Sequence, residues 1–239
     1  MSHSRSLYLS LLLLVSGPGF AATGTLWCDG AVRGTAALVD ISAYAPTARY
    51  QVISTAAHVL YNPHTQQPWQ HCFFQLGNDR FRRLALGEQL QGEAFGNAAS
   101  VTQQAEHDWA FVKLAGRFQQ VKPLLLATWS GSAVPSQTRA YEQVSDRLAN
   151  EKGCQLAGFS QLQMPMLVSH RCNVGRGGSG APLIVQSGGV EQLVAIHGGD
   201  LIINGEVFEQ ARAVDQHMLQ ALSDFVAAPV PSRRESQEI

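Results

Sequence analysis

The stretch Gly175-Arg176-Gly177-Gly178-Ser179-Gly180-Ala181-Pro182 encloses one serine in a run of glycines. A serine hydroxyl is a poor nucleophile at neutral pH unless an imidazole accepts its proton and a carboxylate orients that imidazole. Glycines let backbone N–H groups converge on a developing oxyanion, because no side chain blocks the approach. We therefore predict that Ser179 is a nucleophile and that the amides of Gly177 and Ser179 form an oxyanion hole.

Two motifs upstream supply an imidazole and a carboxylate. His58 ends the segment Ser54-Thr55-Ala56-Ala57-His58, and Asp108 begins the alternating run Asp108-Trp109-Ala110-Phe111-Val112-Lys113-Leu114. Each motif also has an ordinary interpretation: a rim histidine, a strand with a polar first residue, and a turn around the serine. The order His58, Asp108, Ser179, with separations of 50 and 71 residues, favours a catalytic triad instead.

Together the three motifs resemble those of the trypsin-like, chymotrypsin-fold serine peptidases, of the short bacterial secreted kind that includes the glutamyl endopeptidases. The motifs are Thr55-Ala56-Ala57-His58, Asp108-Trp109-Ala110 and Gly177-Gly178-Ser179-Gly180-Ala181-Pro182, and the resemblance covers about residues 24 to 226. It implies that His58 is a general base and then a general acid, that Asp108 orients it and that Ser179 is acylated. It also implies a protein or peptide substrate.

The resemblance points to a pocket for the side chain that precedes the scissile bond. In that family the pocket is lined by the residue six before the nucleophile, here Asn173, and by a later strand. A neutral amide cannot pair with a buried Arg or Lys, which disfavours a basic preference. His197, in Ala195-Ile196-His197-Gly198-Gly199, is similar to the histidine that binds acidic side chains in glutamyl endopeptidases. Capping of a turn is the alternative role for His197.

Three positions depart from the family pattern. Val174 stands where glutamyl endopeptidases commonly have a Ser or Thr hydroxyl. Gly178 stands where the digestive members carry an Asp that receives a newly cut N-terminus, so we expect the oxyanion loop to be preformed or stabilised in another way. Gly198 stands where many relatives place a serine hydroxyl near the catalytic carboxylate, and modest activity would follow.

The composition indicates a soluble globular protein. The chain has 239 residues, 45% of them hydrophobic, and a formal charge of −1. This near-neutral balance provides no field to attract nucleic acid or an anionic membrane, so we interpret Arg80, Arg82 and Arg83 as a solvated strand face. No Cys-x-x-Cys pair or His-Glu-x-x-His helix is present. We therefore expect no metal and no cofactor, and we expect a monomer.

Residues 1–21 have the features of a signal peptide. His3 and Arg5 precede an apolar stretch from Leu7 to Val15, and small residues follow up to Ala21. The apolar stretch is too short for a permanent membrane span. We expect cleavage after Ala21 or Ala22, a secreted or periplasmic location, and no membrane association afterwards.

Four cysteines in an exported chain indicate two disulfides, for which three pairings are possible. We favour Cys28–Cys72, which would bracket His58 much as a bridge brackets the base in the resembling family. The second disulfide would then be Cys154–Cys172, which would tie two strands together before the nucleophile loop.

Short alternating runs separated by glycine, proline and asparagine indicate an all-β chain. They fall at Gly34–Asp40, Tyr50–Ser54, Cys72–Leu76, Phe81–Leu86, Ala110–Leu114, Arg139–Val144, Cys154–Phe159, Met166–His170, Pro182–Gln186, Gln192–Ile196 and Glu206–Ala213. With the resemblance, they predict two antiparallel Greek-key β-barrels with the site between them.

Two helices are expected as well. One short turn covers Ala56–Leu60, and a terminal helix is indicated by apolar residues at three- and four-residue spacing on one face. They are Val214, Met218, Leu219, Leu222, Phe225 and Val226. We expect this helix to pack on the second barrel.

Pro123, Gly131 and Pro135 place the domain boundary within Ala115–Ser136. The expected organisation is a signal peptide at 1–21, a first barrel at 22–122, a second barrel with its helix at 123–228, and a disordered tail at 229–239.

Two other functions compete with a secreted serine endopeptidase. A binding protein could keep the peptidase scaffold without turnover, although inactive scaffolds usually lose a triad residue. An esterase or other acyl hydrolase could use the same triad.

Overall fold

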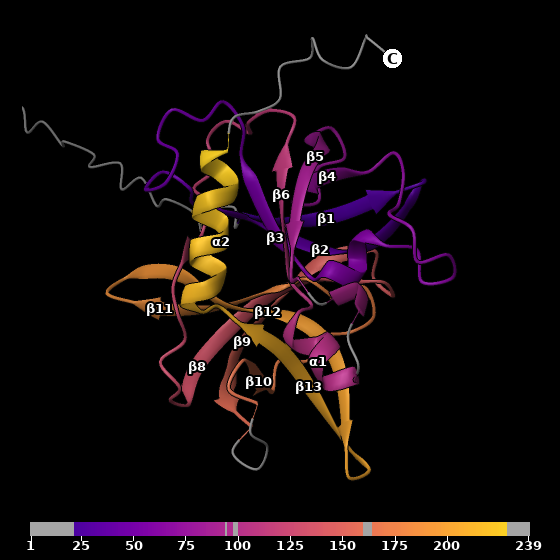
Figure 1. The fold of residues 1–239 in the computed structure, drawn as a ribbon, viewed down its shortest axis with the longest axis vertical. Coiled ribbons are helices and arrows are strands. Elements are labelled where there is room, and N and C mark those ends of the chain that lie inside the picture. Colours follow the sequence, from indigo (N-terminus) through magenta and orange to yellow (C-terminus); the bar gives the residue numbers. More distant parts are fainter. Residues whose placement is uncertain (1–21, 94, 98–99, 160–163, 229–239) are drawn as a thin grey trace, which may run out of the picture.

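The computed structural model describes residues 22–93, 95–97, 100–159 and 164–228, drawn as a coloured ribbon in Figure 1. The expected signal peptide and tail lie outside these residues. The described chain begins at the first strand and ends just after the terminal helix.

The first barrel closes in the order β1-β2-β3-β6-β5-β4, with neighbouring strands antiparallel. Its strands are β1 (Thr23–Cys28), β2 (Ala31–Val39), β3 (Val52–Thr55), β4 (Phe73–Leu76), β5 (Arg83–Gln91) and β6 (Ala110–Leu114). Asp29 and Gly30 connect β1 to β2 with φ of +50° and +79°. Positive φ at both central residues is the backbone that a two-residue hairpin turn requires.

The second barrel has the order β11-β8-β9-β10-β13-β12 and is closed by pairing of β11 with β12. Its strands are β8 (Val134–Glu142), β9 (Arg147–Gly158), β10 (Leu167–His170), β11 (Pro182–Ser187), β12 (Val190–Ile203) and β13 (Glu206–Ala213). The short β7 (Leu125–Leu126) adds to β12 in parallel. Figure 1 shows the two barrels one above the other. The prediction of two antiparallel β-barrels with a C-terminal helix is confirmed.

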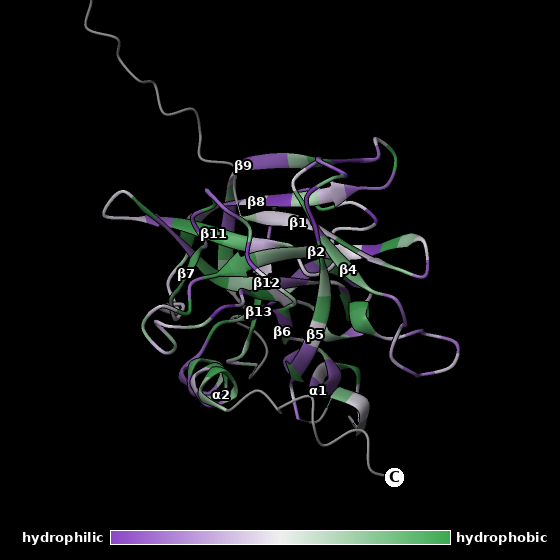
Figure 2. Cartoon of the chain, turned by 90° about the horizontal axis from the view of Figure 1, so that it is seen from above, coloured by the Kyte–Doolittle hydropathy of each residue, from purple (hydrophilic) through white to green (hydrophobic). Residues whose placement is uncertain are grey.

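The strand predictions were right at the centres and short at several ends. β9 begins seven residues before the predicted Cys154, in a polar and largely exposed stretch that Figure 2 colours hydrophilic. β1, β7 and the helix α1 (Val101–Glu106) were not predicted. These segments lack a long apolar alternation, and pairing with neighbours determines their conformation.

The terminal helix α2 (Gln216–Ala227) begins at Asp215, whose side chain accepts a hydrogen bond from the Met218 amide at 2.8 Å. The expectation that it packs on the second barrel is only partly right. Met218, Leu222 and Val226 belong to the apolar cluster that also fills the first barrel. The Tyr50 hydroxyl of the first barrel donates a hydrogen bond to the carbonyl of Val226 at 2.9 Å. The helix therefore holds the two barrels together.

Both predicted disulfides are confirmed: Cys28–Cys72 and Cys154–Cys172 are bonded. The change from one barrel to the other occurs between β6 and β8, where Leu124 bridges to Val39 and β7 pairs with the second barrel. The domain boundary after residue 122 stays a proposal. No helix among the described residues is long and apolar enough to cross a membrane.

Candidate active site

His58 and Asp108 are brought together by the pairing of β3 with β6. Thr55 is opposite Ala110 in this pair, so the turn after β3 lies beside Asp108, which is two residues before β6. His58 lies in the 3-10 helix η1 (Ala57–Leu60). Asp108 contacts it twice: Oδ2 is 2.7 Å from Nδ1 of the imidazole, and Oδ1 accepts the His58 backbone N–H at 2.9 Å. The carboxylate thus fixes both the ring and the backbone that carries it.

The carboxylate is also responsible for the charge state of His58. Burial alone would lower the pKa of His58, but the charge of Asp108 and its hydrogen bond together raise the pKa above 6.5. The His58 side chain remains 41% exposed, whereas that of Asp108 is 8% exposed. The imidazole can therefore meet a substrate from the solvent side, while its partner stays shielded.

The loop that carries Ser179 is a series of tight turns. Gly178 N–H donates to the Gly175 carbonyl at 3.0 Å, and Ala181 N–H donates to the Gly178 carbonyl at 2.8 Å. Gly177 has a φ of +92°, and a Cβ there would approach the Tyr141 ring to 2.6 Å. Glycine at position 177 is thus required both by the backbone conformation and by the lack of space.

The same loop is held against the first barrel. Thr35 of β2 donates its backbone N–H to the Ser179 carbonyl at 2.8 Å and its hydroxyl to the Gly177 carbonyl at 3.1 Å. A Cβ on Gly34 would meet both the Ser179 carbonyl and the side chain of Val59, the residue after His58. The half-buried Ser179 is therefore beside the His58 segment. No hydrogen bond between described residues joins the Ser179 hydroxyl to His58, and in free enzymes this contact often tightens only on binding.

Two amides of the loop are left without acceptors. Among the described residues, neither the Gly177 N–H nor the Ser179 N–H is hydrogen-bonded to a protein group. The amides between and after them, those of Gly178 and Gly180, are both bonded. Unpaired backbone N–H groups beside one serine are the kind of donors that can stabilise an oxyanion.

His197, one of the two residues predicted to line the substrate pocket, is buried among polar side chains inside the second barrel. Its Nδ1 is 2.8 Å from Nε2 of His170, and the two rings meet edge to face. Nδ1 of His170 is 3.2 Å from Glu209 Oε2 and accepts the Cys172 N–H at 3.3 Å. Sequence reasoning missed His170 and Glu209, because β10 and β12 are not neighbours in the sheet and their side chains meet only inside the closed barrel.

Burial keeps both rings neutral. Burial, together with repulsion from the protonated forms of His170 and His58, lowers the pKa of His197 to about 3. Burial likewise lowers the pKa of His170 to about 4. Since neutral imidazole has one N–H, a proton on His170 Nε2 makes His197 Nδ1 an acceptor and puts the His197 proton on Nε2. That Nε2 has no partner among the described residues.

Asn173 is exposed and makes no hydrogen bond with another described residue. The neighbouring Val174 instead donates its backbone N–H to Glu209 at 3.2 Å, which ties this loop to the histidine pair. The structure thus joins His197 to a buried network but leaves Asn173 at the surface.

The space left by Gly198 is filled from the next strand. A Cβ on Gly198 would be 2.2 Å from Nε2 of Gln210, a residue of β13 that is 5% exposed. Gln210 also lines a small cavity of about 190 Å³ with His58 and Asp108. The side-chain amide of Gln210 therefore lies near His58 and Asp108, where the sequence showed only a missing hydroxyl.

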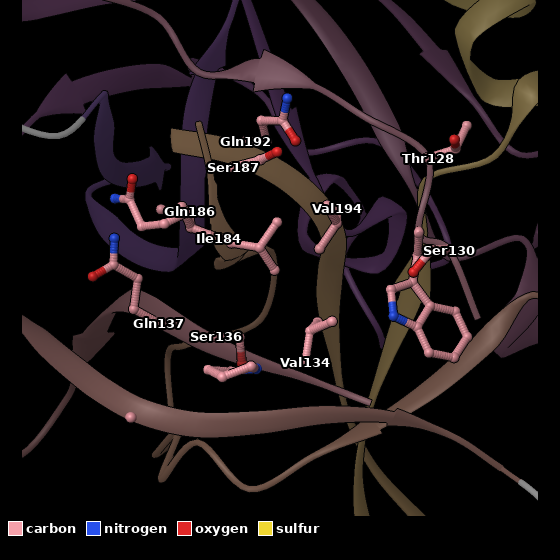
Figure 3. Close-up of a pocket in the computed structure, with 14 residues that line it drawn as sticks. Thr128, Ser130, Val134, Ser136, Gln137, Ile184, Gln186, Ser187, Gln192 and Val194 are labelled. Atoms are coloured by element: carbon pink, nitrogen blue, oxygen red, sulfur yellow. The ribbon is translucent and has the colours of Figure 1, made fainter. Parts of the chain in front are cut away.

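A separate cavity of about 600 Å³ opens in the second barrel, and Figure 3 shows its lining residues. It forms because β11 pairs with β8 at only two positions, so that Val134 and Gln186 lie on diverging strands. Ile184 and Val194 provide its apolar floor. It contains none of the predicted site residues, and we do not assign it to the active site.

Comparison with solved structures identifies the fold. A Glu endopeptidase in complex with MPD aligns with a TM-score of 0.65 and 13% identity, over 87% of this chain and 92% of that chain. The thermostable serine protease AL20 from an extremophilic microorganism gives 0.67 and 15%, over 88% and 99%. The protease Anisep from Arthrobacter nicotinovorans gives 0.67 and 13%, over 88% and 97%.

No protein-family model matches the sequence, and no curated protein matches it either. At these identities the likenesses establish the chymotrypsin-like double-barrel fold, which confirms at the level of fold the resemblance seen in the three motifs.

Proposed function

We propose that the protein is an exported serine endopeptidase that hydrolyses peptide bonds through an acyl-enzyme on Ser179. The observation that carries this proposal is the pair of hydrogen bonds from His58 to Asp108, one from Nδ1 at 2.7 Å and one from the backbone N–H at 2.9 Å. They lie beside the Ser179 loop, in which two amides have no acceptor among the described residues. The fold shared with serine proteases adds support.

In the proposed mechanism, His58 is the base. Its Nδ1–H donates to Asp108, which leaves the lone pair on Nε2 to take the proton of Ser179 as the hydroxyl attacks the scissile carbonyl. The resulting imidazolium is stabilised by the adjacent carboxylate. The carbonyl oxygen becomes an oxyanion, to which the amides of Gly177 and Ser179 donate.

Collapse of this intermediate breaks the peptide bond. His58 gives its proton to the leaving amine, and the acyl group stays on Ser179 as an ester. Water then enters, His58 takes one of its protons, and the hydroxide attacks the ester carbonyl. Return of that proton to the Ser179 oxygen releases the acid product and restores the free enzyme.

We further propose that the enzyme prefers an acidic side chain before the scissile bond. A neutral His197 with its proton on Nε2 would donate to a bound carboxylate. His170 behind it would become protonated more readily, because that carboxylate and Glu209 would both favour a cation between them. In this proposal, His197, His170 and Glu209 together take over the role of the Ser or Thr hydroxyl that glutamyl endopeptidases commonly have at the position of Val174.

Export is proposed from the signal-like segment at 1–21. The two disulfides support it, since structural disulfides persist in oxidising compartments and are rare in the cytosol. Mass spectrometry of protein recovered from outside the cytoplasm tests this: the expected mature N-terminus follows Ala21 or Ala22, and an intact Met1 would contradict it.

Two alternatives remain distinguishable from the proposal. A binding protein on this scaffold would form no covalent adduct at Ser179. An esterase would acylate Ser179 but would cleave esters and not peptides. The unbonded amides of Gly177 and Ser179 favour turnover over simple binding.

A phosphonofluoridate probe tests the nucleophile. We expect labelling of wild-type protein at Ser179, as located by peptide mapping, and none of Ser179→Ala. Ser145→Ala, on an exposed turn, is the matched control and should label normally. Folded protein that resists labelling would refute the proposed function.

Cleavage-site profiling of a denatured protein mixture then tests the reaction and its preference. We expect cuts that follow Glu or Asp. Cuts without such a preference would remove the acidic proposal only, whereas ester hydrolysis with no cuts at all would favour the esterase.

A further inference from the structure

Another cavity, of about 370 Å³, lies beside His58 and is lined only by residues that precede β7 in the chain. Its walls come from the start of β2, from η1, from the loop at 61–72, and from Phe95 and Gln104 in the segment between β5 and β6. Three of its lining residues are aromatic: Tyr61, Trp69 and Phe95. None of the residues assigned above to the acidic pocket lines it, so it is a separate site next to the same imidazole.

The strands on either side of Ser179 indicate which part of a substrate reaches this cavity. β12 borders the loop on one side: the His197 carbonyl accepts the Gly180 N–H at 2.8 Å. β2 borders it on the other, through the bond from Thr35 to the Ser179 carbonyl. On the proposed function, the side chain before the scissile bond points to His197. The residues after it are therefore directed towards β2 and His58, which protonates the leaving amine.

Arg33 brings a permanent positive charge to this cavity, and no carboxylate is among the lining residues. Its Nε donates to the Cys28 carbonyl at 3.2 Å. Among the described residues, neither Nη atom of Arg33 has a hydrogen-bond or ion-pair partner. A planar guanidinium with free N–H groups is suited to bind a carboxylate with two parallel hydrogen bonds.

The guanidinium is also held in position. It lies 3.6 Å from the centre of the Trp69 ring, a cation–π contact, while Cys28 anchors its Nε. The disulfide from Cys28 to Cys72 ties this anchor to the loop that carries Trp69. Arg33 therefore loses little further side-chain freedom when it binds a ligand, which favours selectivity.

We propose that this cavity receives an acidic side chain from the first or second residue after the scissile bond, and that Arg33 is the residue that selects it. The aromatic walls contact the methylene groups of that side chain, and the free Nη atoms bind its carboxylate. Glutamate is favoured over aspartate, because its longer chain covers more of the apolar wall. Together with His197, the enzyme then recognises acidic side chains on both sides of the bond it cuts.

Matched fluorogenic peptides test the inference. They share one acyl side and carry Glu, its neutral isostere Gln, or Lys at the first or the second position after the scissile bond. We expect kcat/KM to favour Glu by about three- to tenfold at one of these positions at low ionic strength, and less in high salt. Arg33→Gln should bring the ratio of kcat/KM for the Glu and Gln peptides to about one. Arg33→Glu should instead favour the Lys peptide at the same position.

Arg80→Gln, which removes the same charge from an exposed turn, is the matched control and should keep the wild-type ratio. Thermal unfolding shows whether each variant is folded, and the reversed preference of Arg33→Glu is a gain that misfolding cannot produce. A Glu/Gln ratio of one in a wild-type enzyme that labels at Ser179 overturns this inference and leaves the proposed function intact. Absence of labelling overturns both.

Discussion

The two barrels differ in what fills them. Large apolar side chains such as Phe74 and Phe111 occupy the first barrel, whereas the second encloses two buried histidines bonded to each other and approached by Glu209. On our account the first barrel contributes the base and its carboxylate, which act on any substrate. The second contributes the nucleophile together with a polar interior that acts on the side chain before the scissile bond, whereas Arg33 of the first barrel acts on a side chain after it. General chemistry and selectivity should therefore respond to different mutations.

Asp108→Asn should have the largest effect and the least selective one. Loss of the carboxylate leaves His58 without its orienting partner, and kcat/KM should fall by about 10³- to 10⁴-fold for acidic and neutral substrates alike. The pKa of His58, which Asp108 raises, should fall, so the acidic limb of the rate against pH moves to lower pH. Kinetics from pH 5 to 9 measure both effects. Asp224→Asn on α2 is the control, and an equal loss there would contradict this role for Asp108.

Gly177→Ala should come next, with a loss of about 10²-fold in kcat. The new Cβ meets the Tyr141 ring at a φ of +92°, so the loop must shift and the oxyanion donor with it. Gly131→Ala is a matched control, because Gly131 has a φ of +83° but open space around it. Unfolding and labelling rates of the two variants separate strain from lost catalysis. Equal activity in both would show that the position of the Gly177 amide does not matter.

His197→Gln should change selectivity more than rate. We expect the preference for Glu over Gln before the scissile bond to fall about 10- to 100-fold, as for loss of a hydrogen bond to a charge. His217→Gln, on the exposed face of α2, should keep the preference. Equal loss on both substrates would place His197 with the general chemistry, and the division between the barrels would then be wrong.

Stability against pH should show the smallest effect. The folded-state pKa values of His170 and His197, about 4 and 3, lie below the unfolded value of 6.5. The unfolded chain therefore binds more protons between these values, and the free energy of unfolding should fall as pH drops from about 6.5 to 4. Each histidine contributes on the order of 2 kcal/mol to this fall in the free energy of unfolding. Glu209 partly offsets it, because burial raises the pKa of its carboxyl group. Urea unfolding at several pH values should show that the free energy of unfolding depends less steeply on pH in His170→Gln than in the wild type. An unchanged dependence on pH would contradict this contribution of His170.

The sequence was sufficient where chemistry is local. The motifs around His58, Asp108 and Ser179 gave the family resemblance, and this resemblance predicted the double barrel together with the alternating runs. With the count of four cysteines, it also predicted the disulfide pairing. The Asp29-Gly30 pair was an available hairpin signal that would have predicted β1.

Features that need the closed barrel could not be predicted. His170 meets His197 across the interior, and Gln210 fills the space beside Gly198 from a neighbouring strand. Arg33 and Trp69 come together only because the hairpin and the loop after η1 fold over each other. None of these pairs has a spacing in the sequence that a period of two or 3.6 residues would reveal.

The central claim is that the base, the carboxylate and the nucleophile act together beside two waiting amides. A crystal structure of the phosphonylated protein tests it most directly. We expect an adduct on Ser179, with its anionic oxygen about 2.7–3.1 Å from the amides of Gly177 and Ser179 and with His58 still bonded to Asp108. An adduct on another residue, or an oxygen directed to solvent while those amides bond elsewhere, would contradict it.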